Sequence, residues 1–353
     1  MTTLQSGVEI KPTKPWASSF KDLLPDFATF VITFVAAYVT VGFTPLKGKL
    51  GFSVMVIIYA LIFSALLALI RQDGKAAINA VTTVLVYIAG LFVILPLASI
   101  LYEIVKRGIG GLSLGIFTTD MAVTASDAPL TEGGLLHALV GTLYIVVIAT
   151  LLSVPIGILT ALYLTEVKGK GAGLVRFFVQ AMSGVPSIVA GLFIYAVWMI
   201  ALGNSYSAAA GAMALTILMI PTVARTSEEV LKLIPNDLRE AGVALGGTQW
   251  RTVAMIVIPA AKSGLITAVI LGIARVAGET APLLLTMGGA DALNLNPLDG
   301  NSSALPFYIW KNFTLGTELA IQRAWTGILV LMILVLIFFT FARVVGSRKG
   351  SSK

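Results

Sequence analysis

The segment that decides the architecture reads Glu240-Ala241-Gly242, then Gly246, then Ile256-Val257-Ile258-Pro259. Three residues separate the first group from Gly246, and nine more separate Gly246 from the apolar group that ends in proline. The segment is polar and lies between two very apolar runs of the chain. It therefore predicts a docking element at a membrane surface, and it has no obvious place in a soluble enzyme.

The residues around Glu240 predict a short helix. Pro235 suits a helix start, because it lacks the N–H that would stay unpaired there. Asp237 can cap the helix, with Glu240 three residues later in a capping-box relation. The helix is expected to run from Leu238 to Leu245 and to stop at Gly246, a C-terminal stop signal.

A second short helix is expected to start at Thr248 and to carry Trp250 toward the membrane surface. The first helix has a face without bulk on which a partner's backbone can approach closely, formed by Ala241, Gly242 and Ala244. Arg239 and Glu240 flank that face and can make charged contacts with the partner. The predicted docking residues are Asp237, Leu238, Arg239, Glu240, Ala241, Gly242 and Gly246.

The composition indicates a membrane protein. Of the 353 residues, 57% are hydrophobic and 12% are charged, whereas a soluble domain carries about 25% charged residues. There is no cysteine, which excludes disulfides and thiolate metal sites, and the single histidine, His137, cannot build a metal site alone. The net charge of +7 is best explained by Lys and Arg in cytoplasmic loops and not by nucleic-acid binding.

Apolar runs of membrane length predict an all-α, polytopic fold. A helix needs about 20 residues to cross the hydrocarbon. Eight runs are expected to be transmembrane helices, at about 27–44, 51–70, 80–102, 135–164, 174–201, 208–226, 263–287 and 325–345. The expected organisation is a cytoplasmic tail (1–26), a two-helix hairpin (27–79), a transport domain (80–345) that contains the docking loop (235–259), and a second cytoplasmic tail (346–353).

The distribution of Lys and Arg predicts the orientation. With the first tail inside, the inner segments hold 17 of these residues and the outer segments hold 6, with Arg275 inside the membrane. This bias favours both termini in the cytoplasm. The docking segment then also lies in the cytoplasm, and two long loops, at about 103–134 and 288–324, face outward.

An ionisable pair lies in the seventh apolar run. Arg275 falls near its middle, where an arginine costs about 2.5–3.5 kcal/mol on insertion scales, and Glu279 is expected one helical turn further on the same face. The guanidinium offers a planar fork of donors that matches a tetrahedral oxyanion. The carboxylate repels sulfate but can accept a hydrogen bond from the P–OH of hydrogen phosphate. A structural ion pair between packed helices remains the alternative.

Hydroxyl side chains near two prolines are further candidates for the substrate path. Ser183 and Ser187 flank Pro186, and Thr280 follows Glu279. A proline within a span frees a carbonyl that needs lining groups or water. The alternatives are a plain helix kink and hydroxyls bonded to their own backbone.

These motifs resemble those of ATP-binding-cassette (ABC) importer permeases. The segment from Glu240 to Pro259 is similar to their EAA loop, E-A-A, three residues, G, nine residues, I-x-L-P, with Gly242 for the third residue and Ile258 for Leu. The run Ala274–Leu284 resembles the A-R-x-x-G-E-T-A-P-L-L of phosphate permeases of the PstA type. The run Gly184–Phe193 is similar to G-V-P-S-I-V-x-G-L-F of the same family.

The resemblance implies a six-helix type I importer core over about 80–345, with the first two helices outside it. It implies a multi-pass protein of the plasma membrane that imports phosphate beside a PstC-like permease, a dimer of PstB-like ATP-binding subunits and an extracytoplasmic PstS-like phosphate-binding protein. Lipid surrounds it, and no nucleic acid is expected. No G-x-x-x-x-G-K-[ST] loop occurs in the chain, so ATP and Mg²⁺ are expected on the partner, with no cofactor bound here.

Two other functions fit parts of the same sequence pattern. One is import of another oxyanion, such as sulfate or molybdate. The other is a self-contained, ion-coupled anion transporter that uses Arg275 and Glu279 but needs no docking helix.

Overall fold

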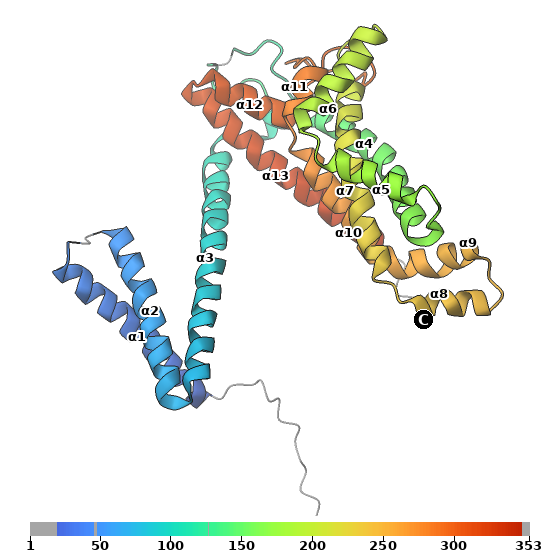
Figure 1. Ribbon diagram of the computed structural model, residues 1–353. Coiled ribbons are helices and arrows are strands. Elements are labelled where there is room, and N and C mark those ends of the chain that lie inside the picture. The colour runs from blue at the N-terminus through green and yellow to red at the C-terminus, as the bar shows by residue number, and fades with distance from the viewer. Residues whose placement is uncertain (1–19, 46–47, 126, 348–353) are drawn as a thin grey trace, which may run out of the picture. The chain divides into compact units, whose positions relative to one another are not determined.

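The computed structural model describes residues 20–45, 48–125 and 127–347 (Figure 1). Within these ranges the chain is helical and contains no strand, only one isolated bridge between Gly288 and Ser302. The chain divides into two compact units, the first ending at Leu101 and the second beginning at Tyr102. The all-α fold predicted from the apolar runs is confirmed.

The first unit holds α1 (Phe20–Phe43), α2 (Lys49–Arg71) and the greater part of α3 (Gly74–Gly108). α1 and α2 pack against each other as a hairpin. Thr40 Oγ1 lies 2.7 Å from the Tyr59 hydroxyl, one on each helix. The predicted N-terminal pair of apolar helices is therefore present.

The second unit forms the main helical bundle. Its helices are α4 (Leu136–Leu162), α5 (Ala172–Ser183), α6 (Ser187–Ile194), α7 (Ala208–Lys232), α8 (Asn236–Ala244), α9 (Gln249–Thr252), α10 (Ile258–Ala277), α11 (Ala281–Thr286), α12 (Leu305–Leu315) and α13 (Glu318–Ser347). Three π-helical turns extend them, at Tyr163–Val167, Tyr195–Ala201 and Val253–Val257. Figure 1 shows α8 and α9 at one end of this unit, away from α11 and α12.

α7 is the central helix of the bundle, with α4 and α10 packed on it. Val223 of α7 illustrates how closely they approach. A Cβ added at Gly157 of α4 or at Gly272 of α10 would lie 2.8 Å from Val223 side-chain atoms. Small residues at these crossings let the helix backbones come together, which is how helices associate in a membrane.

Among the described residues, six helices are long and apolar enough to cross a membrane, and a bent pair could supply a seventh. The six include α2, α7 and α13, close to the predicted second, sixth and eighth spans. The first predicted span corresponds to a shorter apolar helix, Phe27–Phe43. The third is longer than predicted, since its helix starts at Gly74 and reaches Gly108. The count of eight crossings stays a prediction.

The fifth predicted span, 174–201, is wrong as a continuous helix. The chain breaks between α5 and α6, and the two parts are bent by 102°. Pro186 sits at the break with φ −58° and ψ 137°. Proline lacks the N–H needed to continue the helix and pushes its predecessor toward extended conformations, so this span is broken and not merely kinked.

The seventh predicted span, 263–287, also has different limits. Helix runs from Gln249 through the turn Val253–Val257 into α10, and it ends at Ala277. The π-helical turn ends two residues before Pro259, whose missing N–H would interrupt a regular α-helical ladder. At the other end Gly278 interrupts the helix before α11 begins.

α12 lies inside a segment that hydropathy assigned to an outer loop. The residues that favour this helix lie at its two ends. Pro306 is in the first turn, and Gly316 follows the last residue with φ +74°. These are the start and stop residues that favour a short helix.

Candidate functional site

The docking hairpin is formed by residues 235–259, which contain α8, α9 and the start of the next span. α8 ends at Ala244, and Gly246 turns the chain with φ +82°. Thr248 caps α9, and its side chain accepts a hydrogen bond from the Arg251 N–H. The predicted stop at Gly246 and the predicted second helix from Thr248 are both confirmed.

The predicted capping box is wrong. The N-cap of α8 is Pro235, without a side-chain hydrogen bond, so Asp237 lies inside the first turn. There its carboxylate still favours the helix through the positive N-terminal end of the helix dipole. Asp237, Leu238 and Glu240 are exposed and remain available to a partner.

Gly242 packs inside the hairpin and does not face a partner. It is buried, and a Cβ there would lie 2.6 Å from Thr252 Cγ2 and 2.7 Å from Ile256 Cδ1. The glycine therefore lets α8 approach the returning helix of the same chain. Ala241 and Ala244 stay exposed.

Arg239, predicted to contact a partner, also makes contacts within the chain. Its guanidinium donates to the Glu166 carboxylate, with Nη2 2.8 Å from Oε1, and to the backbone oxygens of Ile234 and Leu231. The Glu166 and Arg239 side chains are only 6% and 21% exposed. The Glu166 carboxylate holds the pKa of Arg239 above its ordinary value. Sequence patterns missed this pair, because its members are 73 residues apart.

Both arms of the hairpin are tied to the end of α4. Gln249 of α9 donates to the Glu166 backbone oxygen at 2.7 Å, beside the pair made by α8. The hairpin also carries exposed apolar and acidic side chains. The apolar ones are Leu238, Val243, Leu245 and Trp250, and the acidic ones are Asp237 and Glu240. Exposed apolar side chains beside charged ones are common at protein-binding surfaces.

Arg275 is exposed in the last turn of α10, inside a membrane-length helix. The expected pairing with Glu279 is wrong. The helix ends at Ala277, and within the described part of the chain no ion pair joins Arg275 to Glu279. Glu279 instead lies half-buried in the break before α11.

The remaining predicted path residues lie at the two helix breaks. Ser187 is the first residue of α6, and Thr280 precedes α11. These two short helices pack together, and a Cβ at Gly191 of α6 would lie 2.7 Å from Cα of Pro282. Ser183 donates to the backbone oxygen of Val179, so its hydroxyl proton is used within α5.

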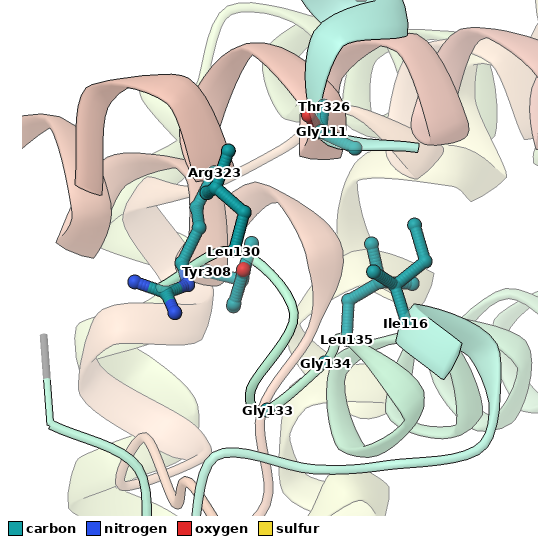
Figure 2. A pocket seen from close by; sticks show the side chains of 9 residues that line it. All are labelled: Gly111, Ile116, Leu130, Gly133, Gly134, Leu135, Tyr308, Arg323 and Thr326. Carbon is teal, nitrogen blue, oxygen red and sulfur yellow. The ribbon is translucent and has the colours of Figure 1, made fainter. Parts of the chain in front are cut away.

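The end of the unit opposite the hairpin is closed by linked loops. Figure 2 shows Arg323 pointing to the loop that carries Leu130, at a cavity of about 20 Å³. The Arg323 Nη2 donates to the backbone oxygens of Ala128, Pro129 and Glu132. Such a buried cation stabilises the loop through charge-assisted hydrogen bonds.

A second link joins the two long loops. Asp120 accepts hydrogen bonds from the Leu293 and Ala122 N–H groups, and these bonds hold the pKa of its carboxyl below the ordinary value. Met121 donates to the Asp291 backbone oxygen, and the Asp291 carboxylate pairs with Lys311. The loops therefore form an ordered cap over this end of the bundle.

A helical membrane bundle with a docking hairpin at one end and an exposed arginine inside a span has the features of a transporter subunit that works with separate partners. Comparison with known families agrees. Residues 153–351 match the family described as binding-protein-dependent transport system inner membrane component.

Curated relatives define the subfamily. The phosphate transport system permease protein PstA 1 of Mycobacterium tuberculosis is 38% identical over 73% of this chain and 84% of its own length. PstA of Mycobacterium leprae is 40% identical over 73% of this chain and 84% of its own length. PstA of Pasteurella multocida is 36% identical over 77% of this chain and 95% of its own length. The chain belongs to the PstA family of phosphate transport system permeases. Among solved structures, the inward-facing MetNI methionine ABC transporter is 21% identical over 61% of this chain and 93% of its own, with a TM-score of 0.48.

Proposed function

We propose that this chain is a membrane-spanning subunit of an ATP-driven importer of inorganic phosphate and forms half of its translocation path. The observation that carries the proposal is Arg275, a cation exposed on a membrane-length helix that continues directly into a docking hairpin. The names of the PstA relatives supply the substrate.

Arg275 is the proposed centre of the substrate path. Ionisable side chains within membrane spans are costly when they face lipid, and they generally face the bundle interior or a water-filled cavity. Arg275 is exposed in the last turn of α10, and no carboxylate of the described residues forms an ion pair with it. Its face of α10 is therefore expected to meet water or another subunit. A PstC-like second permease that completes a water-filled path satisfies this requirement.

Glu279, Thr280 and Ser187 are the proposed companions of Arg275 in the path. They lie at the two helix breaks, where backbone groups are released from the helical ladder and can line a polar path. The Glu279 carboxylate accepts a hydrogen bond from the P–OH of hydrogen phosphate and repels sulfate. The site then distinguishes phosphate from sulfate by the proton on the phosphate oxygen and not by the size of the ion.

The hairpin is the proposed contact with the ATP-binding subunits. Its exposed apolar and acidic surface docks on a PstB-like dimer in the cytoplasm, and both chain termini lie on that side. The end of α13 lines a groove together with residues 263–270 of α10. The ordered loops at the opposite end receive a PstS-like phosphate-binding protein.

The test is ATP-dependent uptake of radiolabelled phosphate by the reconstituted complex, with and without this chain. Uptake is expected only with the chain and with hydrolysable ATP, and a tenfold excess of sulfate is expected to leave it unchanged. Equal inhibition by sulfate would contradict the substrate. Uptake driven by a proton gradient without ATP would contradict the ATP-driven mechanism.

A further inference from the structure

A basic cavity lies behind the docking hairpin, at the junction of four helices. Its volume is about 380 Å³, which gives room for an oxyanion with several waters. Its lining is Leu164, Thr165, Lys168, Ala172, Arg176, Lys232, Asn236 and Arg239. Four of these residues are cations and none is a carboxylate.

Three of these cations, Arg176, Lys232 and Arg239, pair with buried carboxylates. Glu228 pairs with Arg176 and Lys232, and its side chain is 6% exposed, like that of Glu166 behind Arg239. The exposed Glu229 also pairs with Lys232. These ion pairs hold Arg176, Lys232 and Arg239 in place.

Hydrogen-bond donors remain for a ligand. Arg176 uses Nε and Nη2 on Glu228, which leaves Nη1 without a partner among the described residues. Lys168 is exposed, lies just beyond the end of a helix with φ +50°, and forms no ion pair within the described part of the chain. The first residues of α5 and α8, Ala172 and Asn236, also line the cavity, and helix N-termini favour anions.

We propose that this cavity binds a phosphate group, either as inorganic phosphate or as the headgroup of an anionic phospholipid. Arg239 lines the cavity and also holds the hairpin to Glu166, so an anion there ties together the ends of α4, α5, α7 and α8. Occupancy therefore slows the movement of the docking hairpin. If the occupant is free phosphate, the imported ion inhibits its own uptake. The inference rests on the proposed function only in assigning this cavity to the cytoplasmic side.

The binding test measures chemical labelling and not transport. The complex is placed in nanodiscs of zwitterionic lipid, and lysine acylation is followed by mass spectrometry with inorganic phosphate or with chloride at equal ionic strength. Phosphate at millimolar concentration is expected to slow acylation of Lys168 at least threefold. Lys170, exposed two residues away and outside the lining, is the control and should not change. The protection should persist in the Arg275→Gln variant, which separates the cavity from the translocation path.

A second arm identifies the source of the phosphate group. Protection by anionic phosphatidylglycerol, without added phosphate, assigns the cavity to a lipid headgroup. Protection by inorganic phosphate in zwitterionic lipid assigns it to the free ion. The proposal is overturned if neither slows labelling of Lys168 more than of Lys170, or if removal of the ATP-binding subunits alone exposes Lys168.

The functional consequence is tested in proteoliposomes. With phosphate in the compartment that holds the ATP, uptake by the unmodified complex should fall severalfold. Lys168→Gln should relieve this inhibition, and Lys170→Gln should not. Equal inhibition of all three proteins would contradict regulation through the cavity.

Discussion

Arg239 of the docking helix α8 is bound to Glu166 at the end of α4 by three hydrogen-bond contacts, the shortest of 2.8 Å. The same guanidinium donates to the backbone oxygens of Leu231, in the last turn of α7, and of Ile234, in the turn that follows α7. A displacement of α8 is therefore expected to be transmitted directly to the ends of α4 and α7 through these hydrogen bonds. A second route is the continuous helix from α9 into α10, which ends near Arg275.

Glu166→Gln should uncouple ATP hydrolysis from transport. Breaking a buried ion pair costs about 3–5 kcal/mol, so the junction should loosen while the subunits still assemble. We expect uptake to fall at least about tenfold and ATP hydrolysis to fall less, both measured on the reconstituted complex. The control is Glu229→Gln, which removes a carboxylate of 73% exposure nearby. Normal uptake by Glu166→Gln would show that this pair does not transmit the movement.

Arg275→Gln should abolish phosphate uptake and leave assembly intact. The side chain makes no ion pair within the described residues, so its loss leaves no buried carboxylate without a partner. Arg275→Lys should retain a small part of the uptake, since lysine keeps the charge but loses the planar fork. The matched control is Arg343→Gln, another exposed arginine on a membrane helix. Uptake at the unmodified rate in Arg275→Gln would remove the arginine from the path.

Gly242→Val should open the hairpin and weaken its binding to the ATP-binding subunits. Any Cβ at this position lies under 3 Å from side-chain atoms of Thr252 and Ile256, and overpacking a tight contact costs about 1–3 kcal/mol. We expect copurification of the ATP-binding subunits to decrease severalfold. Gly173→Ala, at a position with open space around it, should have no such effect. Full copurification of the valine variant would show that the hairpin tolerates a wider spacing.

The link between the outer loops should depend on pH. Because the folded state lowers the pKa of Asp120, its carboxylate stabilises the contact above the ordinary value of 3.8. That stabilisation is lost as the pH falls through the lowered folded value. The protection of the Leu293 amide, which is its intrinsic exchange rate divided by the observed rate, should therefore be high at pH 7 and at pH 5 and should fall at pH values below 3.8. Asp120→Ala should show low protection over the whole range, and protection that is independent of both changes would exclude this role.

Hydropathy and local residue signals predicted much of the fold. The membrane helices, the stop at Gly246 and the start after Thr248 all follow from short-range patterns. The limits of the broken spans did not follow, because hydropathy reads a run of apolar residues as one helix. Pro186 and Gly278 mark those breaks, but the same residues occur inside continuous helices, as Pro155 does in α4.

The roles of the docking residues were likewise predicted only in part from the sequence. The sequence predicted a docking helix with a face of small residues flanked by Arg239 and Glu240, and of the predicted docking residues Asp237, Leu238 and Glu240 are exposed. It assigned Arg239 and Gly242 to a partner, whereas both are used inside the chain. Their roles depend on Glu166 and Thr252, which no sequence spacing connects to them.

By itself, the sequence determined that this chain is a helical membrane protein with a docking loop and an arginine inside a span, because burial in lipid and helix termination depend on neighbouring residues. Only the tertiary structure decided which charges are paired. It joined Arg239 to Glu166, separated Arg275 from Glu279 and gathered four cations around one cavity. Ion pairs form over a few ångströms of space, and the packing of α4, α7 and α8 sets those distances.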